Sequence, residues 1–189
     1  MKILCLHPTQ DGAISVEAGA DSAILRHGEP VFPDDRPDGW RSLIVPAIRI
    51  SRLGTSIRRS RARNYYDSFT FFHVLWPASG NTVASGIPAA IADRTFSPGT
   101  WLPMPEQPVT ARVSVRPLAL ETSTVTDIVL NPDSLGADAA VEWLSQYMTF
   151  KTGDILLFFA HGTEIGPATP DTEITVHAAT DEVLRFRIK

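Results

Sequence analysis

The sequence predicts a mainly β protein (α+β) with a few short helices, and three observations carry this prediction. Fifteen prolines and twelve glycines are spread along the chain, which is typical of many short strands joined by turns. Two segments, 109–116 and 183–189, alternate apolar and polar residues as half-buried strands do. The segment 151–159 opens with a Thr-Gly-Asp turn and continues into five consecutive apolar residues, which indicates a strand buried on both faces.

The N-terminal third is expected to begin with a strand. Segment 1–8 has one positive charge and a very short apolar run, too little for a signal peptide, and is therefore predicted to be the first strand of the folded domain. Segment 9–20 is small and polar and is expected to be a loop. Short strands are expected within 23–33. The apolar run 43–50 is typical of a strand in which Pro46 implies a sheet edge or a bulge.

The middle of the chain is expected to hold the helices. A short helix is predicted within 57–67, followed by a buried apolar run at 69–76. The best helical pattern is 138–147, where apolar residues recur at helical spacing and Asp138 is expected to be the N-cap.

The composition indicates an ordinary globular protein. With 189 residues, 43% hydrophobic and 20% charged, the chain is expected to form one domain over residues 1–189 with a substantial core. No apolar run approaches the roughly 20 residues of a membrane span, so no membrane association is expected. The single cysteine, Cys5, lies in the predicted first strand, and a buried, inert thiol in a cytoplasmic protein is the simplest interpretation.

Charge is distributed unevenly. The block Arg41–Arg63 holds seven arginines, and no acidic residue lies between Arg41 and Tyr66. One interpretation is an anionic partner such as nucleic acid. The net charge of −4 and the absence of any nucleic-acid-binding motif favour instead a solvated face, or salt bridges to the acidic remainder. No nucleic acid is therefore expected among the partners.

The order of several segments resembles the fumarylacetoacetate hydrolase family, specifically its small single-domain bacterial members. The matching segments, which cover nearly the whole chain, are 20–26, 47–54, 65–67, 86–92, 151–154, 162–163 and 186–189. The resemblance implies a mixed β-roll, of the type of that family's C-terminal domain, usually in a homodimer. It also implies action on 2-oxo or 1,3-dicarbonyl acids with Mg²⁺ or Mn²⁺ as cofactor.

The family's chemistry depends on carboxylates, because these hard cations demand oxygen ligands. Its members supply a Glu-x-Glu pair on one strand, whose alternate side chains point the same way, and an aspartate from a later strand. The bound ion polarises the oxygens of the substrate and stabilises the enolate that forms. A nearby lysine and arginine hold the negative charge of the substrate.

The resemblance places apolar residues at all three ligand positions. Aligning 47–54 puts Leu43 and Val45 at the Glu-x-Glu pair, and aligning 65–67 puts Val74 at the aspartate. Asp93 falls at the lysine position. A shift of one residue restores no ligand, since no acid lies between Arg41 and Tyr66. The sequence therefore predicts that the family's metal site is lost and that no metal is bound.

Other polar residues are candidates for a replacement site. They are His7, His73, His161, Asp67, Asp93 and Glu164. His161, Gly162 and Thr163 belong to a loop that lines the pocket in the family, so the resemblance implies that they bind substrate. His73 interrupts an apolar run and is expected to be a hydrogen-bonded core residue. No known motif proposes a replacement chemistry, and the catalytic residues are left unassigned.

Two functions remain open. The first is a catalytically inactive binding or scaffolding homologue, which keeps the fold and acts as a homodimer or with an active paralogue. The second is a working hydrolase, isomerase or decarboxylase on a 2-oxo or 1,3-dicarbonyl acid with a rearranged site. Because function follows the site rather than the fold, the missing carboxylates favour the first. The first also predicts a protein that is stable without metal.

Overall fold

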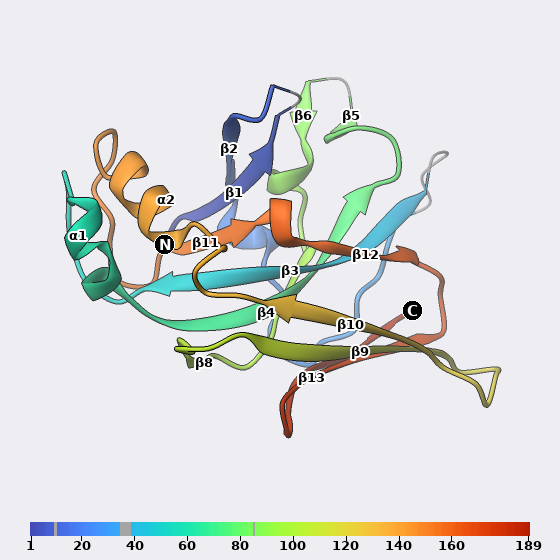
Figure 1. Ribbon diagram of the computed structural model, residues 1–189. Helices are drawn as coiled ribbons and strands as arrows, with labels where there is room; N and C mark the ends of the chain where they lie inside the picture. Colours follow the sequence, from blue (N-terminus) through green and yellow to red (C-terminus); the bar gives the residue numbers. More distant parts are fainter. Residues whose placement is uncertain (10, 35–38, 85) are drawn as a thin grey trace.

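A computed structural model describes residues 1–9, 11–34, 39–84 and 86–189 of the chain. Two β-sheets dominate it, one of eight strands and one of four, and a third small sheet has two. The helices lie at one end of the larger sheet, with α1 and α2 beside each other (Figure 1). The prediction of a mainly β fold with a few short helices is confirmed.

The larger sheet has the strand order β2-β1-β11-β3-β4-β7, with β12 also pairing β3 and β8 also pairing β4. Its strands are β1 (Ile3–Pro8), β2 (Ile14–Gly19), β3 (Trp40–Ile50), β4 (Tyr66–Pro77), β7 (Phe96–Pro98), β8 (Leu102–Pro103), β11 (Ile155–Phe158) and β12 (Thr163–Pro167). Strands β1 and β11 pair in parallel, and the other named pairs in this sheet are antiparallel. The sheet is therefore mixed, as expected.

The smaller sheet is antiparallel throughout, in the order β10-β9-β13-β14. Its strands are β9 (Val109–Pro117), β10 (Thr124–Leu130), β13 (Thr172–Ala178) and β14 (Asp181–Ile188), while β5 (Thr82–Ala84) and β6 (Ile87–Pro88) form the third sheet. In β9 the buried residues Ala111 and Val113 alternate with exposed or half-buried ones. This alternation shows that one face of the smaller sheet packs inward and the other faces solvent.

The helices are few and short. They are α1 (Arg59–Ala62) and α2 (Ala137–Leu144), with 3-10 turns η1 (Asp21–Ala23), η2 (Arg63–Tyr65), η3 (Ala89–Ile91) and η4 (Phe159–His161). Across the described residues, the helices are all too short or too polar to traverse a lipid bilayer. Helix α2 buries Ala137, Ala140, Val141 and Leu144, because these residues recur on one helical face.

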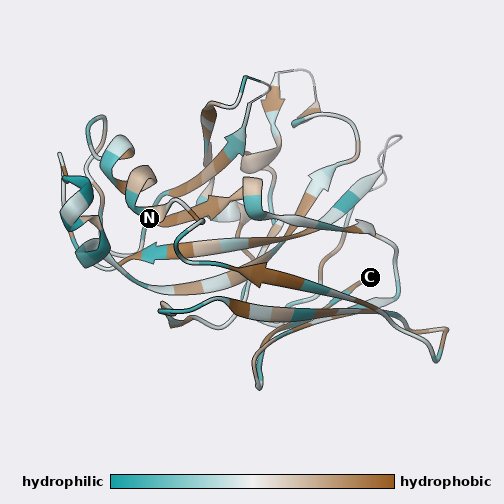
Figure 2. Cartoon of the chain, in the orientation of Figure 1, coloured by the Kyte–Doolittle hydropathy of each residue, from teal (hydrophilic) through white to brown (hydrophobic). Residues whose placement is uncertain are grey.

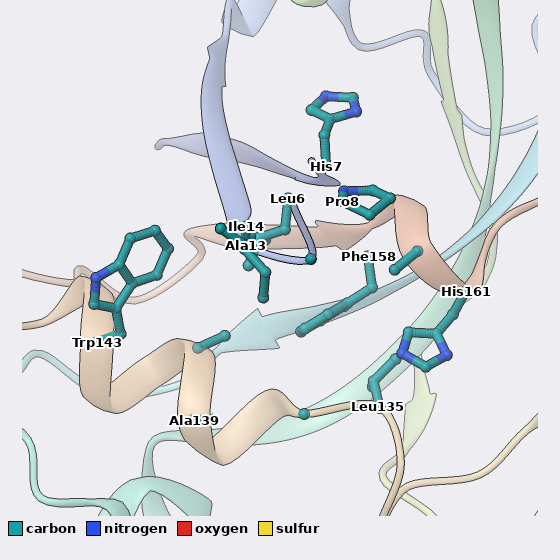
Figure 3. Close-up of a pocket in the computed structure, with 14 residues that line it drawn as sticks. Leu6, His7, Pro8, Ala13, Ile14, Leu135, Ala139, Trp143, Phe158 and His161 are labelled. Atoms are coloured by element: carbon teal, nitrogen blue, oxygen red, sulfur yellow. The ribbon is translucent and has the colours of Figure 1, made fainter. Parts of the chain in front are cut away.

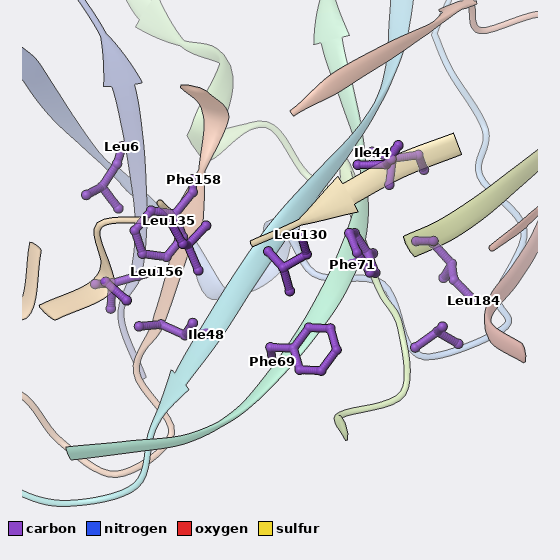
Figure 4. Packing of buried hydrophobic residues seen from close by; sticks show 14 of the residues in the cluster. Leu6, Ile44, Ile48, Phe69, Phe71, Leu130, Leu135, Leu156, Phe158 and Leu184 are labelled. Carbon is purple, nitrogen blue, oxygen red and sulfur yellow. The ribbon is translucent and has the colours of Figure 1, made fainter. Parts of the chain in front are cut away.

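The core has two parts, one on each face of the larger sheet. The part between the two sheets and under α2, called here the Phe71 cluster, is shown in Figure 4 and includes Leu6, Ile44, Ile48, Phe71, Leu156 and Phe158. The part on the opposite face, the Phe72 cluster, includes Ile3, Cys5, Val45, Ala47, Phe72, Val74, Trp76 and Leu157. Both faces of β11 are therefore buried, as its unbroken apolar run predicts, and Figure 2 shows the apolar colouring along it.

Several predicted elements are confirmed. The first strand is β1, the segment 57–67 contains α1 and η2, and the apolar run 69–76 lies in β4. The alternating segments 109–116 and 183–189 belong to β9 and β14. Local periodicity was sufficient for these elements because each presents its apolar residues to a core at a constant spacing.

Three local predictions are wrong. Segment 9–20 is not a loop throughout, because β2 pairs antiparallel with β1 along residues 14–19. Segment 23–33 forms no strand, although Ile24 and Val31 make isolated bridges to Phe96 and Ile188. Helix α2 begins one residue early, with Gly136 in a left-handed conformation (φ 73°) as its N-cap and Asp138 in its first turn.

Strand β3 is not an edge strand, although it contains Pro46. It pairs with β4 along its whole length. On its other side it pairs with β12 from Arg41 to Ile44 and with β11 from Ala47 to Arg49. Pro46 therefore lies opposite the gap between β11 and β12, where the backbone forms η4. A proline is tolerated at this point because no partner strand there requires its missing N–H group.

Candidate functional site

Leu43, Val45 and Val74 lie together on one face of the larger sheet. Leu43 on β3 is directly opposite Val74 on β4 in the antiparallel register, and Val45 is two residues along the same strand. Residues two apart on a strand point to the same face. Val45 and Val74 are fully buried in the Phe72 cluster, and Leu43 packs against it. The three positions that the resemblance equates with metal ligands thus converge in one apolar layer.

Aromatic rings close this layer. The rings of Trp76 and Phe159 are 4.9 Å apart, and the His7 ring lies 4.1 Å from Phe159 and 5.2 Å from Trp76, measured between centroids. The Trp76 indole donates a hydrogen bond of 3.1 Å to the Asn81 side chain, which fixes its orientation. Trp76 is 2% exposed, so its ring packs as core, whereas Phe159 and His7 are half-buried.

The divalent cation of the family does not fit these residues. Leu43, Val45 and Val74 present only hydrocarbon, whereas Mg²⁺ and Mn²⁺ require oxygen ligands. In the described parts of the chain, no group of three or more His, Cys, Asp or Glu residues is arranged to hold a metal ion. No catalytic step through a metal follows from this arrangement.

A histidine and a carboxylate face each other at the edge of the same layer. His7 Nε2 on β1 lies 3.5 Å from Glu17 Oε2 on β2. The two atoms form no hydrogen bond, and Glu17 Oε1 also has none. Burial lowers the pKa of His7. Burial raises the pKa of Glu17, and a hydrogen bond from the Ala90 backbone offsets part of this rise. Both groups therefore shift toward their neutral forms.

The residues expected to bind substrate lie at the end of β11. His161 ends η4 and borders a cavity (Figure 3). Gly162 packs against β3, and Thr163 begins β12 opposite Ile44. A Cβ on Gly162 would lie 3.1 Å from Val45 Cγ2 and 3.2 Å from the Phe159 carbonyl oxygen. Glycine at position 162 therefore allows this loop to approach β3 closely.

The remaining candidates are dispersed. His73 is fully buried, with Nε2 3.1 Å from Ser42 Oγ, and burial lowers its pKa to about 3, so the expected core role is confirmed. Asp67 and Asp93 are exposed. Glu164 forms an ion pair of 3.3 Å with Arg41.

The arginines of the block Arg41–Arg63 make scattered contacts. The guanidinium of Arg49 lies over the Trp101 ring at 4.9 Å, and that of Arg63 over the Tyr66 ring at 5.0 Å, each measured to the centroid. Arg52, Arg58, Arg59, Arg61 and Arg63 are exposed. The exposed arginines agree with the expectation of a solvated face, whereas the stacking of Arg49 and Arg63 on aromatic rings was not expected.

A buried ion pair anchors the start of β11. The fully buried carboxylate of Asp154 lies 2.6 Å from Lys2 Nζ and accepts hydrogen bonds from the backbone amides of Lys2 and Lys151 at 2.7 and 2.8 Å. Burial alone would raise the pKa of Asp154, but these hydrogen bonds and the Lys2 charge lower it below its usual range. Gly153, at φ 91°, makes the turn that brings this carboxylate inward.

Glu17 is a site residue that the sequence did not reveal, because the small and polar segment around it is typical of a loop. A signal for it exists, since Asp11-Gly12 is a hairpin motif and Gly12 adopts φ 81° at the turn. A hairpin at this point produces β2, and its antiparallel register sets Glu17 opposite Cys5. Cys5 is buried, as expected, and burial, with the Glu17 charge, raises the pKa of its thiol.

Comparison with known proteins finds similar solved structures but no similar sequence. No family model matches the chain, and no curated protein matches it. Among solved structures, a fumarylacetoacetate hydrolase family protein from Yersinia pestis CO92 superposes with a TM-score of 0.76 at 14% identity, covering 100% of this chain and 92% of that one. The 5-carboxymethyl-2-hydroxymuconate delta-isomerase from Mycobacterium smegmatis superposes with a TM-score of 0.75 at 15% identity, covering 99% and 78%.

A third similar structure contains a metal. The fumarylpyruvate hydrolase from Pseudomonas aeruginosa, in complex with Mn²⁺ and pyruvate, superposes with a TM-score of 0.72 at 14% identity and covers 100% of this chain and 89% of that one. Identities this low establish the architecture alone. The chain has the fold of the fumarylacetoacetate hydrolase family.

Proposed function

We propose that this protein is a fumarylacetoacetate hydrolase-fold protein that works without the family's divalent metal, as a binding or scaffolding protein. One observation carries the proposal: Leu43, Val45 and Val74 meet in an apolar layer, with Val45 and Val74 fully buried, where the resemblance expects three carboxylates. Carboxylates held together at one site repel one another unless a cation neutralises them. Hydrocarbon at these positions needs no cation, so the fold is stable without metal.

Residues 1–189 act as one cytoplasmic domain, which associates as a homodimer or with an active paralogue. A small 2-oxo acid is the ligand class that the fold family suggests. Of the three residues expected to bind it, Gly162 and Thr163 lie against β3 and would meet it, whereas His161 borders a cavity on the other face of the sheet. Support for this loop comes from its geometry, since Gly162 brings it against β3 beside Val45.

The test is a calorimetric titration of the protein with Mg²⁺ and Mn²⁺, paired with thermal melts at the same concentrations. We expect no saturable heat in the micromolar to millimolar range and no change in melting temperature. Micromolar binding together with a raised melting temperature, as ligand linkage requires, would overturn the proposal. Treatment with a chelator is the matched control and should leave the melting temperature unchanged.

A second candidate function is favoured by the His7 and Glu17 pair. A carboxylate 3.5 Å from an imidazole, at the edge of the same layer, could orient the ring for acid–base chemistry without a metal. Burial lowers the pKa of His7, which keeps the imidazole neutral and able to accept a proton near neutral pH. The reaction would be hydrolysis, isomerisation or decarboxylation of a 2-oxo or 1,3-dicarbonyl acid.

This second function is tested by assaying a panel of 2-oxo and 1,3-dicarbonyl acids in chelator-treated buffer. Turnover that His7→Gln and Glu17→Gln both reduce at least tenfold would support it. The control is His177→Gln, because His177 is part of the smaller sheet and should leave any turnover unchanged. Absence of turnover across the panel would leave the binding function as the better account.

A further inference from the structure

A cavity of about 480 Å³ lies on the other face of the larger sheet, away from Val45. Its floor is formed by Leu6, Leu135 and Phe158, which are 3–4% exposed and belong to the Phe71 cluster. Helix α2 forms one wall, and the β1–β2 turn forms the other (Figure 3). Since the Phe71 and Phe72 clusters occupy opposite faces of the sheet, this cavity is distinct from the layer described above.

Small side chains on both walls create the space. Ala13 projects from the β1–β2 turn, and Ala139 and Ala140 project from α2. No larger side chain fills the gap between them. The volume falls within the roughly 300–1,000 Å³ that is typical of small-molecule sites.

The lining is almost entirely apolar. It contains no Asp, Glu, Lys or Arg. In Figure 3 the His7 ring points away from Ile14, Leu135 and Trp143, consistent with its stacking on Phe159 on the other face. His161 is therefore the polar side chain available at one end, and its ring makes no hydrogen bond with the described residues.

The mouth exposes large apolar side chains to water. Ile14 is 50% exposed and Trp143 is 37% exposed, at either side of the opening. A ligand that covers them would gain about 25 cal/mol for each Å² of apolar surface removed from water. An aromatic ring would also stack against the Trp143 indole at low conformational cost.

We propose that this cavity is a binding site for a small monocyclic aromatic molecule with one polar substituent, a carboxylate or a hydroxyl. The ring occupies the space between Ala13, Ala139 and Phe158, and the substituent hydrogen-bonds with the His161 imidazole. The enclosed floor and the absence of Asp, Glu, Lys and Arg from the lining fit the uncharged aromatic ring of such a ligand better than a charged peptide. The site does not depend on whether the protein binds a metal at Leu43, Val45 and Val74, because none of the residues that line the cavity belongs to the Phe72 cluster.

The test uses alanine methyl NMR, since four lining residues are alanines, namely Ala13, Ala139, Ala140 and Ala160. Benzoate and phenol are the probes, and toluene is the comparison without a polar group. We expect saturable shifts at the lining methyls for all three, with Ala111 and Ala178 of the smaller sheet unmoved. Absence of saturable shifts up to millimolar probe, or shifts that map elsewhere, would overturn the proposal.

Two variants separate the contribution of the cavity space to probe binding from the contribution of the His161 imidazole. Ala139→Phe should fill the cavity and weaken every probe at least tenfold, whereas Val125→Phe on β10, where Val125 is 53% exposed, should have no effect. His161→Leu should weaken benzoate and phenol by about two- to tenfold, the value of one hydrogen bond, while toluene changes less than twofold.

A second copy of the chain is the competing occupant. If the lining methyls shift with protein concentration in the absence of probe, and sedimentation shows a dimer that Ala139→Phe dissociates, the groove is a subunit interface. That outcome would overturn the small-molecule proposal. A thermal melt of Ala139→Phe within a few degrees of wild type confirms that the variant is folded.

Discussion

Leu43 of β3 lies directly opposite Val74 of β4, and the pair packs as hydrocarbon where the resemblance expects two carboxylates. Val45, two residues along β3, is fully buried beside them. The three positions that the resemblance equates with metal ligands therefore lie in one apolar layer.

Introducing a carboxylate into this layer should be strongly destabilising. Val45→Glu buries an unpaired charge and should lower the free energy of unfolding by about 3–5 kcal/mol, measured by urea denaturation. The matched control is Val129→Glu on β10, where the side chain is 63% exposed and the change should be within about 0.5 kcal/mol. If Val45→Glu fails to fold, Val45→Thr should still cost about 1–3 kcal/mol. Unchanged stability in either variant would contradict a dry layer.

Restoring all three carboxylates should create a metal dependence that the wild type lacks. The triple variant Leu43→Glu, Val45→Glu and Val74→Asp should be poorly folded in chelator and should gain stability with Mn²⁺. The physical reason is that a bound cation offsets the repulsion among the carboxylates. Thermal melts with and without about 1–10 mM Mn²⁺, a range suited to weak sites, measure it. Equal responses of variant and wild type would argue against the alignment of these positions.

His73 should make stability depend on pH in the mildly acidic range. Its pKa is lowered to about 3 in the folded protein by burial, whereas the unfolded chain has the ordinary value near 6.5. Above pH 6.5 the group is neutral in both states and its contribution is full. As the pH falls below 6.5 only the unfolded chain takes up the proton, so stability drops by up to about 1.4 kcal/mol per pH unit.

The measurement is the free energy of unfolding between pH 7 and pH 5. His73→Leu should be less stable at pH 7, because Ser42 Oγ loses its partner, but its pH dependence should be shallower by close to one proton. His177→Gln, at a histidine whose side chain is 43% exposed, serves as the control and should keep the wild-type slope. A slope unaffected by His73→Leu would mean that His73 becomes protonated within the fold.

The ion pair of Asp154 and Lys2 should be important for stability, in contrast to an exposed pair. Asp154→Asn leaves the Lys2 ammonium and two backbone amides with a poorer acceptor and should cost about 2–4 kcal/mol. Glu164→Gln breaks the partly exposed pair with Arg41 and should cost less than about 1 kcal/mol. Comparable losses in the two variants, measured by chemical denaturation, would contradict this ranking.

A larger residue at position 162 should be disfavoured by lack of space rather than by the backbone conformation. Its φ of −73° suits any residue, but a Cβ would lie 3.1 Å from Val45 Cγ2. Gly162→Ala should therefore cost about 1–3 kcal/mol by overpacking. In a double-mutant cycle, Val45→Ala should relieve part of this cost, with a coupling of about 0.5 kcal/mol or more.

The matched control is Gly153→Ala. Gly153 adopts φ 91°, and no atom lies within 4 Å of the position that a Cβ would take there, so the cost of this substitution is conformational. It should show no coupling to Val45→Ala. Coupling of similar size for both glycines would contradict the close approach of the 161–163 loop to β3.

The sequence by itself determined the elements whose apolar spacing is regular. The alternation in 109–116 and 183–189, the unbroken run in β11 and the buried His73 follow from local patterns, since each reports how one segment meets a core. The segment order that resembles the family also sufficed to identify the fold and to point to Leu43, Val45 and Val74. The prediction of a loop was wrong for β2, because its exposed and half-buried residues give little apolar periodicity.

Only the tertiary structure decided which residues from distant segments share a face. The parallel pairing of β1 with β11 places His7 beside Phe159, and the hairpin with β2 places Glu17 opposite Cys5. It also separates His161, at a cavity on one face, from Gly162, against Val45 on the other. Strand register and sheet order set these contacts. Both are fixed by packing across the whole molecule, which no local spacing records.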